Sequence, residues 1–137
     1  MSSFTTSERW RWEEGPQMQP LRTEISFEFT FQAAHTLPWH SGKCRNMHGH
    51  SYRCELFFAG QLTDEGIVVD FDAVDSFVAG ELMPVLDHTY LNDSMPNPTA
   101  ELIAARIFLI ADAAGLPISG VRLWETATSS AIVRPTP

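Results

Sequence analysis

A thiol and two imidazoles lie close together in the segment Cys44–His50. His48 and His50 are separated by one glycine, so in an extended chain both side chains point to the same side. Neutral imidazole is a common zinc ligand in proteins. The spacing therefore predicts that His48 and His50 bind the same metal ion.

A third metal ligand has two candidates in the sequence. His35 ends a stretch of alternating residues just before this segment, whereas His40 lies in a loop that contains proline, serine and glycine. His35 is favoured, because a hairpin would bring it beside His48 and His50 at one end of a sheet. Three protein ligands leave one position on zinc open, which is the arrangement of catalytic rather than structural zinc sites.

The two cysteines receive different interpretations. Cys44 could complete a closed four-ligand zinc site. Alternatively, because it is flanked by Lys43 and Arg45 and would lie close to a zinc ion, the free thiol could act as a base or nucleophile. Cys54 lies on the apolar face of a predicted strand and is interpreted as a core residue. No disulfide framework follows from these two cysteines.

Two acidic positions could also carry chemistry. Asp87 and His88 place a carboxylate beside an imidazole, as in a charge relay, although adjacent residues rarely orient one another directly. Glu125 shares the apolar face of a predicted strand, where a carboxylate needs a partner. That partner is either Arg122 or Arg134, or a ligand that offers amidine-like N–H donors.

The periodicity of the apolar residues predicts the elements that position these groups. Residues 25–35 alternate as a half-buried strand, and a second strand runs from about residue 50 to 59. A helix opens at Asp72, and another begins around Pro98, with the proline in its first turn. Two short strands follow near residues 121–126 and 131–134. The order β-β-α-α-β-β predicts an α+β fold.

The composition limits the class of protein. A chain of 137 residues is the size of one domain, which we place at residues 21–137, with residues 1–20 as a flexible N-terminal extension. A net charge of −8 disfavours binding to nucleic acid. No apolar run approaches the roughly 20 residues of a membrane span, and the first residues lack the apolar stretch of a secretory signal. We therefore expect a cytoplasmic protein with no membrane partner.

Five motifs in register connect these residues to a known family. The set resembles the 6-pyruvoyl-tetrahydropterin synthase / 6-carboxytetrahydropterin synthase family, over about residues 23–134. The motifs are Phe31–His35, Cys44–His50, Leu86–Asn92, Asn97–Glu101 and Trp124–Thr126. The resemblance implies the tunnelling fold, a four-stranded antiparallel sheet with two helices on one face. It also implies trimers that close into a barrel, a homo-hexamer of two trimers, and active sites between subunits.

The resemblance assigns roles to individual side chains. It implies that Zn²⁺ is bound by His35, His48 and His50, and that the Cys44 thiol abstracts a proton. Asp87 and His88 would come from a neighbouring subunit as the partner acid or base. Glu125 would hold the pterin ring through its N–H and amino groups and join the proton relay. Thr99 and Glu101 would line the pterin pocket.

The implied substrate is 7,8-dihydroneopterin triphosphate. The pyruvoyl enzymes eliminate triphosphate and keep the side chain, whereas the carboxy enzymes also release acetaldehyde and leave a 6-carboxyl group for 7-deazapurine (queuosine) synthesis. Cys44 stands four residues before His48, which resembles the carboxy branch, since the pyruvoyl enzymes generally have an insertion there. Residues 127–130 depart from that branch, which often has a cysteine and a glycine turn at this place.

Two alternatives to the carboxy enzyme therefore stay open. One is a pyruvoyl-type synthase with the same site. The other is a non-catalytic zinc- or pterin-binding protein, in which Cys44 would be a fourth metal ligand. A triphosphate substrate also needs local positive charge in an acidic chain, and Lys43, Arg45 and Arg53 lie near the proposed site in the sequence. The sequence does not assign phosphate contacts among them.

Overall fold

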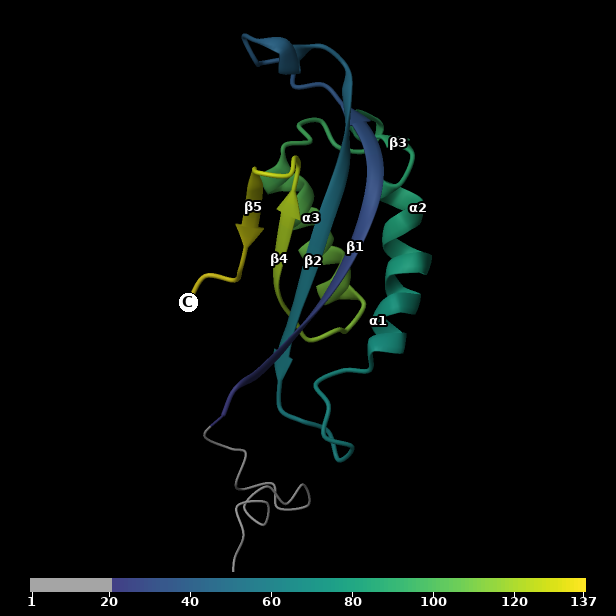
Figure 1. The fold of residues 1–137 in the computed structure, drawn as a ribbon, viewed down its shortest axis with the longest axis vertical. Helices are drawn as coiled ribbons and strands as arrows, with labels where there is room; N and C mark the ends of the chain where they lie inside the picture. Colours follow the sequence, from purple (N-terminus) through teal and green to yellow (C-terminus); the bar gives the residue numbers. More distant parts are fainter. Residues whose placement is uncertain (1–20) are drawn as a thin grey trace, which may run out of the picture.

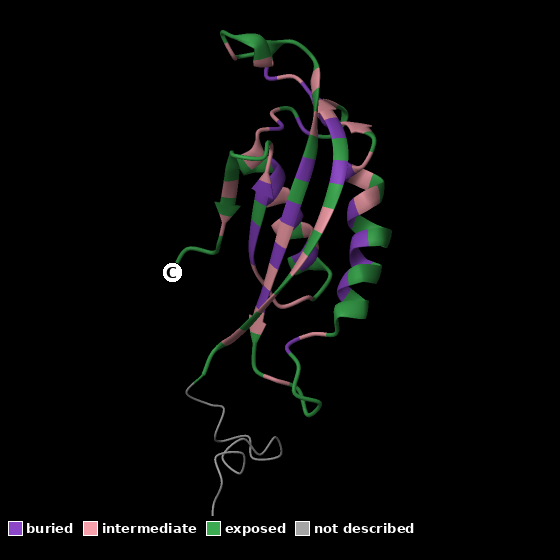
Figure 2. Cartoon of the chain, in the orientation of Figure 1, coloured by how far each residue is buried: buried purple, intermediate pink, exposed green. Residues whose placement is uncertain are grey.

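Two long strands form the centre of the fold in the computed structural model, which describes residues 21–137. β1 (Thr23–His35) and β2 (His48–Gly60) pair antiparallel along their whole length, and His35 lies opposite His48 (Figure 1). Both strands alternate between less and more exposed residues, as the sequence predicted, with the buried positions of β1 confined to Phe31, Ala33 and His35 (Figure 2). The flexible extension expected over residues 1–20 lies outside the described residues.

The sheet differs from the prediction in its number of strands and in their direction. β4 (Ile118–Trp124) pairs with β2, and β5 (Ser130–Val133) pairs with β4, both antiparallel. A further strand, β3 (Thr89–Tyr90), pairs parallel with β1 at the opposite edge. The sheet therefore has five strands in the order β3-β1-β2-β4-β5, and the predicted four-stranded antiparallel sheet is wrong. A strand of two residues is too short to show periodicity, so nothing in the sequence revealed it.

The helical segments pack on the buried side of the sheet, which confirms the α+β class. The first runs without a break through α1 (Phe71–Phe77), a π-helical turn (Val78–Leu82) and α2 (Met83–Leu86) (Figure 1). The wide turn precedes Pro84, which has no N–H to donate to the carbonyl four residues earlier. The second helix, α3 (Ala100–Ala113), packs against β4 and β5.

One apolar core joins these elements. It includes the fully buried side chains of Phe31, Tyr52, Leu56, Leu82, Ile103, Ile107 and Leu123. His35 is the one buried polar or charged residue among residues 21–137, and it lies at the end of this core. Of the helices between residues 21 and 137, none is long and apolar enough to cross a membrane.

Both helix starts differ from the sequence prediction by one or two residues. α1 begins after Asp70, whose carboxylate accepts a 2.8 Å hydrogen bond from the Asp72 amide, so Asp70 rather than Asp72 is the N-cap. α3 begins after Thr99, whose hydroxyl accepts from the Leu102 amide. Pro98 therefore precedes the cap instead of lying in the first turn, and its carbonyl is available to other groups.

We predict that Asp70→Ala lowers the free energy of unfolding by about 1 kcal/mol, because it removes the N-cap of α1. Asp70→Ser is the matched control, since serine caps a helix nearly as well as aspartate does. Urea unfolding followed by circular dichroism measures both. Equal stability of the wild type and the alanine variant would show that the cap contributes nothing.

Candidate metal centre

Three histidines meet where the β1–β2 hairpin begins to open. His35 and His48 are directly opposite each other, and His50 lies two residues further along β2 on the same face. One ligand nitrogen from each lies within 4.8 Å of the other two. His40 takes no part in this cluster, because its Nδ1 accepts a hydrogen bond from the Gly42 amide. The preference for His35 over His40 as third ligand is therefore supported.

Backbone carbonyls fix the tautomers of two of these imidazoles. His35 Nδ1 donates to the Pro98 carbonyl at 2.8 Å, and His48 Nδ1 donates to the Asn46 carbonyl at 2.7 Å. A carbonyl can only accept, so each Nδ1 carries the proton and each Nε2 presents a lone pair. The two Nε2 atoms are 3.0 Å apart and face the same point. Orientation of ligand imidazoles by such outer hydrogen bonds is typical of metal sites.

The third imidazole, that of His50, is partly exposed, but its Nε2 atom is buried without a hydrogen-bonding partner. His50 Nε2 is the one buried side-chain polar atom in residues 21–137 that lacks one. Burial lowers the pKa of His50, and the nearby Glu125 carboxylate opposes that shift. A neutral imidazole with an unused buried nitrogen costs free energy unless something binds it. A metal ion between the three nitrogens would satisfy it, so these residues fit a divalent transition metal.

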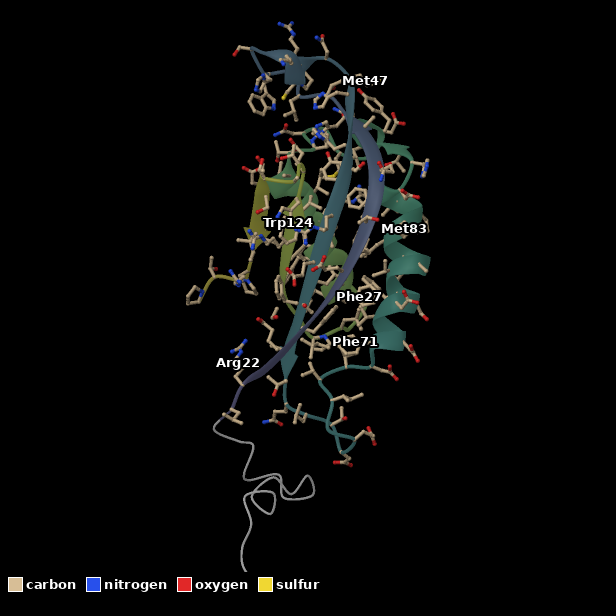
Figure 3. All side chains as sticks on the ribbon, in the orientation of Figure 1. Arg22, Phe27, Met47, Phe71, Met83 and Trp124 are labelled. Carbon is tan, nitrogen blue, oxygen red and sulfur yellow. The ribbon has the colours of Figure 1, made fainter. Side chains whose placement is uncertain are left out.

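Glu125 lies beside this cluster but not on the strand where it was predicted. β4 ends at Trp124, and the Glu125 carboxylate reaches to 3.6 Å from His50 Nε2. The predicted alternative partner Arg122 instead donates to the Ser130 hydroxyl, and its guanidinium lies over the Trp124 ring (Figure 3 labels Trp124). The carboxylate is about one-quarter exposed, so it remains open to a ligand with N–H donors.

Cys44 lies in the loop that joins the two strands carrying the histidines. It occupies a short 3₁₀ turn, Lys43–Arg45, and its side chain is partly exposed. Its sulfur is not among the atoms of the histidine cluster, which favours a free thiol over a fourth metal ligand. The loop extends beyond the sheet at the top of Figure 1, and the labelled Met47 in Figure 3 marks where it rejoins β2.

Asp87 and His88 do contact each other directly, contrary to the sequence argument. The Asp87 carboxylate accepts from the Gln32 amide at 2.9 Å and from His88 Nδ1 at 2.8 Å. His88 has a φ of 56°, in the left-handed region that few residues other than glycine adopt. The backbone hydrogen bond from Gln32 lowers the pKa of Asp87, and the bond from His88 adds to that shift.

An open cavity is bordered by His88 and by one member of the histidine cluster, His50. Its volume is about 470 Å³, and its lining includes His50, Ser51 and Gly49 on β2 together with His88 and Thr89 at the sheet edge. Pockets of this size hold small-molecule ligands. The structure therefore places His50 and His88 of one chain on the same cavity. The supply of Asp87 and His88 by a neighbouring subunit stays a prediction.

Thr99 and Glu101, predicted to line a substrate pocket, belong to the first turn of α3. Thr99 is the N-cap, and Glu101 is exposed at the positive end of the helix dipole. Their role in lining a substrate pocket stays a prediction. The sequence predicted Pro98 only as a helix-start residue, and nothing in it indicated that the Pro98 carbonyl accepts a hydrogen bond from the His35 ring.

Comparisons with known proteins place the chain in a family. The sequence profile described as 6-pyruvoyl tetrahydropterin synthase matches residues 24–136, nearly all of the described chain. The chain belongs to this family. A Synechocystis relative called 6-carboxy-5,6,7,8-tetrahydropterin synthase is 43% identical, over 76% of this chain and 87% of its own length. A Haemophilus influenzae protein of the same name is 34% identical, over 77% and 94%.

A solved structure shows the same fold within the family. The 6-pyruvoyl tetrahydropterin synthase of Caenorhabditis elegans superposes with a TM-score of 0.74 at 20% identity, covering 84% of this chain and 96% of that one. At this identity the likeness concerns the fold alone. The family membership and the histidine cluster together support the metal site that the sequence predicted.

We predict that the native protein reacts with Ellman's reagent at one thiol per chain. Cys54 is fully buried, and burial raises its pKa, so its thiolate is scarce at neutral pH, whereas Cys44 is accessible. Absorbance at 412 nm counts the modified thiols. Cys44→Ala should give none in the native state and one in denaturant, and reaction of both thiols in the native wild type would contradict the buried position of Cys54.

We also predict a pH-dependent contribution from Asp87. Its pKa in the folded state is below the ordinary value of 3.8, so its ionised form stabilises the fold above that pH. The contribution is lost as the pH falls through the lowered folded pKa. The difference in unfolding free energy between the wild type and Asp87→Asn should therefore be constant near neutral pH and shrink in acid. A difference that grows toward low pH would contradict this assignment.

Proposed function

We propose that this chain is a zinc-dependent 6-carboxy-5,6,7,8-tetrahydropterin synthase. It would convert 7,8-dihydroneopterin triphosphate to 6-carboxytetrahydropterin and release acetaldehyde and triphosphate, for use in 7-deazapurine (queuosine) synthesis. The observation that carries the proposal is the unsatisfied His50 Nε2 in a cluster of three imidazoles, in a chain that is 43% identical to a relative of that name.

The three imidazoles suit zinc because they supply nitrogen donors and leave a further position open. Bound zinc would supply positive charge that polarises the hydroxyl groups on the substrate side chain. Hydrogen bonds from His35 to Pro98 and from His48 to Asn46 keep both rings in the ligand orientation before any metal arrives. The protein would therefore not need to reorganise these two ligands on binding.

Proton transfer is the proposed task of Cys44 and of the Asp87–His88 pair. The Cys44 thiol is free and partly exposed, as a base requires. The Asp87 carboxylate accepts from His88 Nδ1, which leaves Nε2 of the largely exposed ring for exchange of a proton with the substrate. Asp87 would thus orient the ring and stabilise its protonated form. Glu125 would accept hydrogen bonds from the pterin, and Thr99 and Glu101 would lie along its pocket.

Two open edges of the sheet support a closed assembly of several chains. Within residues 21–137, β3 pairs with only Ala33 and Ala34 of β1, so most of β1 has no strand partner on that side. At the other edge of this described part of the chain, β5 pairs only with β4. Open edges bind other strands. We therefore propose trimers that close into a barrel, stacked as a homo-hexamer, with Asp87 and His88 completing the site of a neighbouring chain.

A pyruvoyl synthase and a non-catalytic binding protein are the alternatives. The names of the relatives from Synechocystis and Haemophilus influenzae, and the short spacing from Cys44 to His48, favour the carboxy enzyme over the first. The non-catalytic binding protein predicts that Cys44 is a metal ligand. The position of Cys44 outside the histidine cluster argues against that role.

We predict that the zinc-loaded protein converts 7,8-dihydroneopterin triphosphate to a 6-carboxy product with one acetaldehyde per turnover, measured by mass spectrometry. Cys44→Ala should lower turnover by about 10²- to 10⁴-fold, as expected for loss of a catalytic base, and keep its zinc. His48→Ala should lose both zinc and activity.

The same assay separates the alternatives. A 6-pyruvoyl product without acetaldehyde would identify the pyruvoyl synthase. Loss of zinc from Cys44→Ala would indicate a four-ligand structural site. Unchanged substrate in the presence of fully bound zinc would reject the proposed reaction.

A further inference from the structure

The end of β1 is held along its outer edge by the segment that follows α2. The Asp87 carboxylate accepts from the Gln32 amide, and the His88 amide donates to the Gln32 carbonyl at 2.6 Å. β3 then pairs with Ala33 and Ala34. Up to this point the segment holds β1 mainly through backbone groups, as a neighbouring strand does.

Beyond β3 the backbone pairing stops, and the side chain of Asn92 replaces it. The Thr36 amide donates to Asn92 Oδ1 at 2.8 Å, and Asn92 Nδ2 donates to the Thr36 carbonyl at 3.0 Å. A carboxamide has the same donor and acceptor as a peptide group, so Asn92 satisfies both backbone groups of Thr36 at once. Two hydrogen bonds to one residue fix the orientation of its backbone, which a single bond would not.

Thr36 lies between the two functional parts of the proposed site. The residue before it is His35, a member of the histidine cluster. The residue after it is Leu37, which is buried and whose amide donates to the Cys44 carbonyl at 2.9 Å. The direction in which the chain leaves Thr36 therefore sets where Cys44 lies relative to the three imidazoles.

We infer that Asn92 is a positioning residue, which holds the Cys44 loop in register with the metal cluster through the backbone of Thr36. The inference rests on the proposed function, in which Cys44 is the base. In this role Asn92 would affect the position of the Cys44 thiol but not that of the three imidazoles, because the His35 ring is held separately by its hydrogen bond to the Pro98 carbonyl. Loss of Asn92 should release the loop while the three imidazoles keep their places.

Two variants test this role. Asn92→Asp keeps the acceptor for the Thr36 amide but places a second carboxylate oxygen against the Thr36 carbonyl, where two acceptors repel. Asn92→Ala removes both hydrogen bonds without adding charge. Both variants should therefore change the protein in the same direction, whereas an effect of charge alone would appear only in the aspartate variant.

Three measurements give the expected signature. The kcat should fall by about 10- to 100-fold, the usual cost of disturbing a residue that supports a site, while KM changes little. Zinc content should stay at the wild-type value. In the metal-free protein, the rate of Cys44 alkylation by iodoacetamide should rise, because a loosened loop exposes the thiol more often.

Asp70→Ala serves as the stability control, since it removes a helix cap at the opposite end of the sheet (Figure 1). It should lower stability without changing the alkylation rate. Asn92 variants that lose stability but keep the wild-type alkylation rate and kcat would overturn the inference, and so would variants that lose zinc. If the wild type converts no pterin, the proposed function fails, yet the alkylation and zinc measurements still decide the role of Asn92.

Discussion

The register between β1 and β2 is the constraint on which the histidine cluster depends. Side chains alternate between the two faces of a sheet, so His35, His48 and His50 reach one point only because His35 lies opposite His48 and His50 opposite Ala33. A slip of one residue would turn one strand's histidines to the other face. The apolar side chains that share this face, among them Phe31 and Tyr52, prevent such a slip because it would expose them to water. The packing of the core therefore also aligns the three imidazoles.

The segment between α2 and α3 completes what the hairpin begins. It supplies the Asp87 carboxylate to Gln32, the Asn92 amide to Thr36 and the Pro98 carbonyl to His35. Each contact satisfies a backbone or ring group at the end of β1, where the sheet itself offers no further partner. Its last residue before α3, Thr99, caps that helix. The start of α3 and the orientation of the His35 ring are thus fixed by neighbouring residues of one short motif.

The charges at the site are arranged locally in a chain that is acidic overall. The Glu125 carboxylate approaches His50, and the Asp87 carboxylate holds His88. Both favour positive charge nearby, either as a bound cation or as a protonated imidazole. On the helix-free face of the sheet, Arg53 and Arg122 lie over the ring of Trp124, and Arg53 also pairs with Glu28. The net charge of −8 consequently says little about the potential at the site itself.

The sequence by itself determined which residues face the core and which histidines share a face, because strand alternation is a local property with period two. It also identified the family, since five motifs occur in order. Tertiary structure alone decided the features that depend on contacts distant in the sequence. β3 forms only through its pairing with β1. The Pro98 carbonyl accepts a hydrogen bond from the His35 ring, 63 positions away in the sequence, and the Asn92 side chain accepts one from the Thr36 amide, 56 positions away. Glu125 reaches His50 from beyond the end of β4, where alternation no longer applies. Local periodicity carries no information about these pairings, because a hydrogen bond between distant residues leaves no periodic trace in either segment.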